Sequence, residues 1–182
     1  MRRAPCRDGL KNGVAVLAGI LKRYMPLVTG ALIIVVLDQL TKSMVREHVE
    51  LYRIIPVTGF FNITHIQNPG AAFGFMSGVS VKWIGAFFIA LTLLASAVLI
   101  YLYHEAEKEG LALRLALTLI LGGALGNLID RVTIGTVTDF LDFYIGGFHW
   151  WAFNIADSCI TIGAIAAIAV SFFTAGRSAA ES

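Results

Sequence analysis

Four stretches of the chain are apolar for long enough to cross a lipid bilayer, which takes about 20 mostly apolar residues in a helix. They cover residues 24–45, 83–103, 111–129 and 150–173. The second stretch carries no charged residue, whereas Asp38 interrupts the first and Asp157 lies within the fourth. The pattern therefore predicts a mainly α-helical membrane protein with four transmembrane helices and both ends of the chain on one side.

Residues 61–65, between the first two predicted helices, follow a different pattern, in which Phe, Ile and His alternate with Asn and Thr. Alternation with a period of two is typical of a half-buried β-strand. We expect Pro56 and Gly59 to turn the chain before this strand. A Pro-Gly pair at 69–70 opens another turn. The pattern favours a small β-sheet with a short helix, lying on the membrane surface.

Composition supports a membrane protein and excludes several other classes. Of the 182 residues, 57% are hydrophobic and 14% are charged, against about 25% charged residues in typical soluble proteins. The mean hydropathy is +0.77. A soluble fold of this length could not bury so much apolar surface. A net charge of +2 provides no basic face for nucleic acid, and Cys6 and Cys159 are too few for a disulfide framework.

Lysine and arginine are unevenly distributed around the predicted helices, and this bias sets the orientation of the chain. Six of them lie in residues 1–23, and others lie in the loop after the second helix and in the C-terminal tail. Both termini are therefore predicted to be cytoplasmic. We divide the chain into a basic extension (1–23), one membrane domain (24–175) and a cytoplasmic tail (176–182). The extension is interpreted either as an interfacial amphipathic helix or as a frayed end.

Polar side chains within the predicted helices gather near the outer membrane surface. Asp38 lies roughly 21 Å along its helix from the cytoplasmic end, at 1.5 Å per residue. Its spacing from Lys42 is that of a helical ion pair. Asn127, Asp130 and Arg131 share one face at the outer end of the third helix. Asp130 is expected to pair with Arg131 or with a backbone amide.

The fourth predicted helix brings more polar residues to the same depth. Asn154 and Asp157 share a face, and Asp157 is expected roughly 10 Å below the outer surface, seven residues past the start of the helix. Asp139 and Asp142 lie in the loop before it, where we expect Asp142 to be solvated. The glycines in 122–126 allow a neighbouring helix to approach closely. The polar groups of several helices are thus predicted to meet at one membrane interface.

Paired carboxylates are the chemistry that these residues favour. Ser158 has no histidine nearby in the sequence, Cys159 is interpreted as a buried small residue, and the four histidines are too scattered for zinc. Two aspartates held close together share one proton, so that one acts as a base on water and the other as an acid. From the residues alone, a proton-coupled or cation transporter is the alternative, although the sequence shows no repeated halves.

Five motifs give the chain a resemblance to a known family. They are LDQLTK (37–42), QNPGAAFG (67–74), GGALGNLIDR (122–131), VTDF (137–140) and FNIADS (153–158). In this order and spacing they resemble bacterial lipoprotein signal peptidase (signal peptidase II), an aspartic protease of the bacterial inner membrane. The resemblance covers roughly residues 24–175 and says nothing about the first 20 or so residues.

The resemblance implies a catalytic pair at Asp139 and Asp157. The family's other polar site residues fall on Asp38, Asn68, Asn127, Arg131 and Asn154. We add three supporting residues, which are Lys42, Gly70 and Asp130. The segment 68–75 is expected to close over the pair as a mobile lid. Because Lys42 lies one turn away, Asp38 is expected to serve stability more than chemistry.

The implied substrate is a diacylglyceryl-modified prolipoprotein. Its signal peptide would be removed just before the lipidated cysteine, by water activated between the two aspartates. We expect no metal, no organic cofactor and no nucleic acid partner, and we expect a monomer that contacts membrane lipid. The implied location is the bacterial inner membrane, with several membrane passes and the active site near the outer, periplasmic face.

Overall fold

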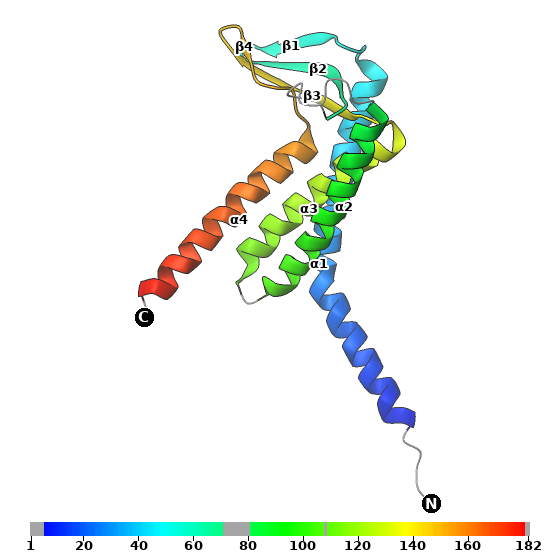
Figure 1. The fold of residues 1–182 in the computed structure, drawn as a ribbon, viewed down its shortest axis with the longest axis vertical. Helices are drawn as coiled ribbons and strands as arrows, with labels where there is room; N and C mark the ends of the chain where they lie inside the picture. The colour runs from blue at the N-terminus through cyan, green and yellow to red at the C-terminus, as the bar shows by residue number, and fades with distance from the viewer. Residues whose placement is uncertain (1–5, 71–80, 108, 181–182) are drawn as a thin grey trace, which may run out of the picture.

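The computed structural model describes residues 6–70, 81–107 and 109–180. Its elements follow one another as α1 (Cys6–His48), β1 (Ile54–Thr58), β2 (Phe61–Asn68), α2 (Val81–Glu105), α3 (Leu111–Thr133), β3 (Val137–Ile145), β4 (Phe148–His149) and α4 (Ile155–Ala180). All four helices are long and apolar enough to cross a membrane. The four strands lie together at one end of the helices, and both ends of the chain lie toward the other (Figure 1).

Helix α3 is the centre of the helical bundle, since α1, α2 and α4 all pack against it. The glycines of α3 make the closest approaches. A Cβ atom on Gly122 would lie 2.8 Å from the Ile34 side chain of α1, and one on Gly126 would lie 2.6 Å from Asp38 Oδ2. A Cβ on Gly123 would overlap the carbonyl oxygen of Ala156 in α4. These glycines pack helices together, as the GxxxG spacing predicts.

Helix α1 runs without interruption from the N-terminal extension into the first predicted transmembrane stretch, with Pro26 inside it. Its first turns project beyond the other helices as a single helix (Figure 1). The placement of the extension at a membrane interface stays a prediction.

Helix α4 begins five residues later than the sequence predicts. Residues 150–154 are extended, because Trp150 N donates to Phe143 O at 2.7 Å and Phe153 pairs with Leu141 of β3. Asp157 therefore lies in the first turn of α4 and not two turns into it, so its expected position along that helix was wrong. Its depth below the outer surface stays a prediction. Apolarity alone could not separate this extended segment from the helix that follows.

The strands form one antiparallel sheet in the order β1-β2-β3-β4. The predicted strand at 61–65 is confirmed and extends to Asn68 as β2. Pro56 does not turn the chain, because it lies in the edge strand β1 opposite Asn62, and only Gly59 lies in the turn. Proline is tolerated in an edge strand, where its missing N–H is not required. The expected short helix over 68–75 falls largely on residues outside the described part of the chain.

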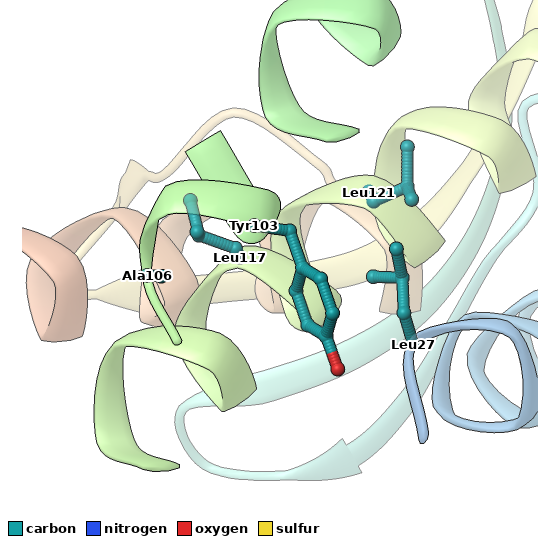
Figure 2. Close-up of a cluster of buried hydrophobic side chains, with 5 residues drawn as sticks. All are labelled: Leu27, Tyr103, Ala106, Leu117 and Leu121. Atoms are coloured by element: carbon teal, nitrogen blue, oxygen red, sulfur yellow. The ribbon is translucent and has the colours of Figure 1, made fainter. Parts of the chain in front are cut away.

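Two apolar clusters of buried side chains pack the elements together, one between helices and one between α1 and the sheet. Leu27, Leu117 and Leu121 surround the buried ring of Tyr103 and join α1, α2 and α3 at the end away from the sheet (Figure 2). Val45 and Val49 at the end of α1 pack with Phe140 of β3. This second cluster fixes the sheet against the helices. Its member Phe140 is the next residue after Asp139 in β3.

Candidate active site

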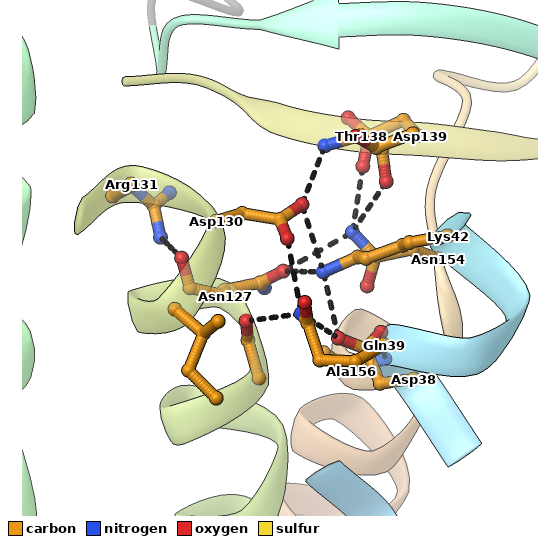
Figure 3. Close-up of polar contacts among 12 residues, drawn as sticks. Asp38, Gln39, Lys42, Asn127, Asp130, Arg131, Thr138, Asp139, Asn154 and Ala156 are labelled. Atoms are coloured by element: carbon orange, nitrogen blue, oxygen red, sulfur yellow. Dashed lines mark hydrogen bonds and ion pairs between the residues drawn. The ribbon is translucent and has the colours of Figure 1, made fainter. Parts of the chain in front are cut away.

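A set of buried polar side chains occupies the junction between the helices and the sheet (Figure 3). Its members come from α1, α3, β3 and the start of α4. The least exposed are Asp38, Lys42, Asn127, Asp130, Thr138, Asp139 and Asn154. The predicted convergence of polar groups from different helices is therefore what the structure shows. It extends to a strand, because Asp139 lies in β3 and not in a loop.

Asn154 connects the two aspartates of the expected catalytic pair. Its Nδ2 donates to Asp139 Oδ1 at 2.7 Å, and its Oδ1 accepts from the backbone N–H of Asp157 at 2.9 Å. The backbone N–H of Asn154 points back to Asp157 Oδ2 at 3.4 Å. Asn154 and Asp157 thus form a reciprocal cap on the first turn of α4. The residue that caps the helix therefore contacts both carboxyl groups, that of Asp139 through its side chain and that of Asp157 through its backbone N–H.

Asp139 accepts a second hydrogen bond from β2. Asn68 Nδ2 donates to Asp139 Oδ2 at 2.9 Å, and Asn68 Oδ1 accepts from Gly70 N at 2.8 Å. Gly70 has a φ of +92°, and a Cβ there would overlap the ring of Phe88, so this position requires glycine. Asn68 and Gly70 therefore lie beside Asp139. The expected lid falls mainly on residues 71–75, which are outside the described part of the chain.

Burial dominates the electrostatics of Asp139. Loss of solvent around its carboxyl group raises its pKa from 3.8 to about 7, and the negative charge of Asp157 acts in the same direction. The hydrogen bonds from Asn68 and Asn154 and the charge of Lys42 oppose this rise. Asp139 therefore holds a proton at a pH where an ordinary aspartate is ionised, as an acid in a carboxylate pair must.

Asp157 is held from the opposite side by α3. Asn127 Nδ2 donates to Asp157 Oδ1 at 2.7 Å. Asn127 Oδ1 accepts from Lys42 Nζ at 2.8 Å and from Asn154 Nδ2 at 3.2 Å. Since an ammonium group can only donate, Lys42 fixes the orientation of the Asn127 amide and directs its N–H toward Asp157.

Lys42 and Asp38 form the ion pair that their spacing predicts. Lys42 Nζ lies 2.8 Å from Asp38 Oδ2 and 3.4 Å from Asp130 Oδ2, and all three side chains are at most 1% exposed. Asp38 Oδ1 also accepts from the backbone N–H of Ala156 at 2.9 Å. Asp38 therefore satisfies one of the free amides at the start of α4.

Asp130 joins α3 to β3 and α1. It accepts from the backbone N–H of Thr138 at 2.9 Å, which confirms the expected backbone partner, and from Gln39 Nε2 at 3.0 Å. Arg46 lies 3.5 Å away. Arg131 contacts other groups, since it donates to Asn127 O at 3.4 Å and lies over the Phe88 ring.

Gln39, Arg46 and Thr138 are members of this network that sequence reasoning did not single out. Arg46 donates to Thr138 Oγ1 at 3.1 Å, and Gln39 also reaches the carbonyl oxygen of Gly126. A signal for the first two was available, because Gln39, Lys42 and Arg46 are spaced to lie on one helical face.

Asp142 was wrongly expected to be solvated. It is 5% exposed, accepts from Asn62 Nδ2 at 2.7 Å and lies 2.9 Å from His149 Nδ1. The segment expected to be a loop is the strand β3. Asp142 is buried because β3 lies between β2 and β4 in the sheet. Its contacts are separate from those of Asp139.

Within the described residues, no group of three or more His, Cys, Asp or Glu side chains is arranged to hold a metal ion. The chemistry available is that of two aspartates held by amide donors, of which Asp139 has a raised pKa. Such a pair can activate a water molecule and protonate a leaving group.

Comparisons with known proteins agree on one family. A family model described as signal peptidase (SPase) II matches residues 30–173. A lipoprotein signal peptidase of Syntrophus aciditrophicus is 47% identical over 140 residues, covering 76% of this chain and 86% of that protein. One from Francisella tularensis subsp. novicida is 44% identical, covering 81% of this chain and 92% of that protein. A solved structure described as a bacterial membrane enzyme aligns with a TM-score of 0.71 at 35% identity, covering 82% of this chain and 88% of that one.

Proposed function

Because the chain belongs to the signal peptidase II family, we propose that Asp139 and Asp157 are the acid–base pair with which it hydrolyses its substrate. The enzyme is an aspartic-type membrane peptidase that removes signal peptides from prolipoproteins. This membership decides against the transporter that the residues alone left open. The observation that carries the proposal is that Asn154 contacts both carboxyl groups, that of Asp139 through its side-chain Nδ2 and that of Asp157 through its backbone N–H.

The two aspartates have different roles in the proposed mechanism. Both oxygens of Asp157 accept from N–H groups, of Asn127 and of Asn154. With Asp139 as the acid of the pair, Asp157 is the base that takes a proton from water as the water oxygen attacks the scissile carbonyl carbon. Asp139, with its raised pKa, is the acid. It donates its proton to the carbonyl oxygen as the tetrahedral intermediate forms. When the C–N bond breaks, Asp157 passes the proton it took from water to the leaving nitrogen, and Asp139 takes a proton back from a hydroxyl of the intermediate.

The position of the pair supports the finer details of the substrate. Asp139 lies in β3 and Asp157 in the first turn of α4. The sheet and the start of α4 lie at the end of the bundle opposite both chain ends (Figure 1). Together with the excess of Lys and Arg near the termini, this supports an active site at the outer face of the bacterial inner membrane. A signal peptide that spans the bilayer would present its cleavage site there, just before the cysteine whose diacylglyceryl group remains in the outer leaflet.

The test of the pair is the activity of Asp139→Asn and Asp157→Asn on a diacylglyceryl-modified precursor in detergent. Each variant should lose at least about 10²-fold in rate, the lower end of what acid–base catalysis contributes. Near-normal cleavage by either variant contradicts the assignment. Mass spectrometry of the wild-type products tests the cleavage site, since the mature fragment should begin at the lipidated cysteine.

Asp142→Asn is the matched control. Asp142 is a buried aspartate in the same strand, but its partners are Asn62 and His149. The control should retain activity while the pair variants lose it. If Asp142→Asn lost as much activity as the pair variants, the loss would be explained by damage to β3 and not by removal of an acid or a base.

A further inference from the structure

An apolar groove of about 610 Å³ runs along the helices from Tyr24 to Leu128 and Ile129, which lie next to Asn127 and Asp130 in the sequence of α3. Val28, Leu32 and Val35 of α1 form one wall, and Leu121 and Leu125 of α3 form the other. Figure 2 shows Leu121 and Leu27, which also line the groove, beside the ring of Tyr103. The groove begins near Tyr24, at the end of the bundle that carries the chain termini.

The open side of this groove faces the bilayer. Val28 is 60% exposed and Leu32 is 58% exposed, although both lie in a segment that crosses the membrane. In that segment the surroundings are lipid chains, so an apolar groove between helices is a site for a hydrocarbon chain. Apolarity alone does not select which lipid.

A cation without a counter-ion lies at the terminal end of the groove. Arg114 of α3 donates to the backbone oxygen of Arg23 at 2.8 Å and to the hydroxyl of Tyr103 at 2.7 Å. Its guanidinium lies over the Tyr103 ring, and among the described residues no carboxylate forms an ion pair with it. Its Nε is buried without a hydrogen-bond partner.

Arg23 adds a second positive charge beside Tyr24, where the groove begins. It pairs with Glu107 at 2.7 Å, which is 54% exposed, and its Nε is also buried without a partner. Charges near a membrane are almost always paired, and basic pockets between helices on the cytoplasmic side bind anionic headgroups. Arginine is especially suited to phosphate because it can donate two parallel hydrogen bonds.

We propose that the groove binds one acyl chain of an anionic phospholipid whose phosphate is held by Arg114 and Arg23. The lipid acts as a structural ligand that joins α1 to α3. The assignment of this lipid to the cytoplasmic leaflet rests on the orientation proposed above. The groove and the two arginines are features of the structure that do not depend on that orientation.

The experiment compares phosphatidylglycerol with phosphatidylcholine of the same acyl chains, added to delipidated enzyme in a neutral detergent. Native mass spectrometry measures bound lipid, and thermal unfolding measures the stabilisation that binding produces. Wild-type enzyme should bind phosphatidylglycerol more tightly and be stabilised more by it. Arg114→Gln should weaken phosphatidylglycerol binding about fivefold, the factor expected for one arginine at a membrane surface. Arg53→Gln, at an exposed position near the sheet, should not.

Leu32→Trp and Ile33→Trp form a matched pair for the groove itself. The two residues are adjacent in α1 and are 58% and 59% exposed, but only Leu32 lines the groove. Leu32→Trp should fill the groove and remove lipid binding, whereas Ile33→Trp should bind as the wild type does. Both should cleave a detergent-solubilised precursor normally, so the result is independent of the proposed catalytic pair.

Three outcomes overturn the proposal. One is unchanged phosphatidylglycerol binding in Leu32→Trp, which would place the lipid elsewhere. Another is equal binding of the two lipids with no effect of Arg114→Gln, which would remove the headgroup site. The third is a change of oligomeric state in Leu32→Trp, measured by light scattering, which would show that the groove is covered by a second copy of the chain.

Discussion

Asp139 makes the stability of the enzyme depend on pH. Its pKa is about 7 in the folded protein and near 3.8 in an exposed chain, and the main cause is burial. Between these values the unfolded chain releases a proton that the folded protein keeps. Burial of this carboxyl group therefore does not lower the free energy of unfolding below about pH 4, where it is protonated in both states. As the pH rises toward about 7, the free energy of unfolding falls.

We expect Asp139→Asn to gain stability relative to the wild type across this range. The difference should grow by up to about 1.4 kcal/mol per pH unit and level off above about pH 7. Any constant offset from altered hydrogen bonds with Asn68 and Asn154 does not change this slope. Thermal unfolding in detergent at several pH values between 4 and 8 measures it, and a difference independent of pH would contradict the argument.

Asp38 is expected to contribute mainly to stability. Asp38→Asn keeps an acceptor for the backbone N–H of Ala156 but leaves the buried charge of Lys42 with Asp130 alone, at 3.4 Å. Breaking a buried ion pair costs about 3–5 kcal/mol. Thermal unfolding should show this loss, while cleavage stays measurable at a temperature where the variant is folded. Unchanged stability together with complete loss of cleavage would assign Asp38 to the chemistry.

At the scale of the elements, the contact between α3 and α4 sets the distance between Asn127 and Asp157. Gly123→Ala would press a methyl group against the backbone of Ala156. Overpacking of this kind costs about 1–3 kcal/mol. Cleavage should fall together with stability, because separating the helices stretches the 2.7 Å hydrogen bond to Asp157.

The control for Gly123→Ala is Gly19→Ala in α1. A Cβ at Gly19 meets nothing within 4 Å, so alanine there should raise stability by up to about 1 kcal/mol. Circular dichroism melts of both variants provide the measurement. A Gly123→Ala enzyme as active and as stable as the wild type would show that α4 can shift without cost.

The helices could be predicted from apolar length, but β3 could not. Aspartates at 139 and 142 interrupt the apolar residues of this strand, and acids are depleted in strands. Here the acids are buried because β2, β4 and the helix ends supply their hydrogen bonds. Such partners come from distant parts of the chain, so no local pattern reveals them. The late start of α4 has the same cause, since residues 150–154 are extended by contacts with β3.

At the scale of the whole molecule, the sheet has to be held against the helices for the site to exist. Phe140 is 6% exposed and packs on Val45 and Val49 of α1. Phe140→Ala should cost about 3–5 kcal/mol and abolish cleavage, because the adjacent Asp139 moves with β3. Far-UV circular dichroism should show that the helices remain.

Phe148→Ala is the comparison for this variant. Phe148 lies in β4, is 71% exposed and does not belong to the second apolar cluster, that of Val45, Val49 and Phe140. Its replacement should leave both cleavage and helix content unchanged. Full activity in Phe140→Ala would mean that the hydrogen bonds of Asp130 and Asn154 alone hold the sheet in place.

The site could be predicted in part from the sequence, for reasons that differ between residues. The Asp38–Lys42 pair follows from one helical turn, and the polar face of α3 follows from its spacing. The bridging by Asn154 could not be foreseen, because it depends on where α4 begins. The pairing of Asp139 with Asp157 came from the resemblance of the motifs, since β3 and α4 meet only in the folded chain.

The ion pair of Asp38 and Lys42 has a consequence for how the protein is made. A charged residue costs up to about 2.5–3.5 kcal/mol, the value at the centre of a helix, when the helix enters the bilayer from the translocon. The first helix is synthesised before α3 and α4, which later surround these charges. Because the two residues are one turn apart, they neutralise each other within the nascent helix, 2.8 Å from nitrogen to oxygen in the finished fold. The helix can therefore be integrated while the rest of the enzyme is still on the ribosome.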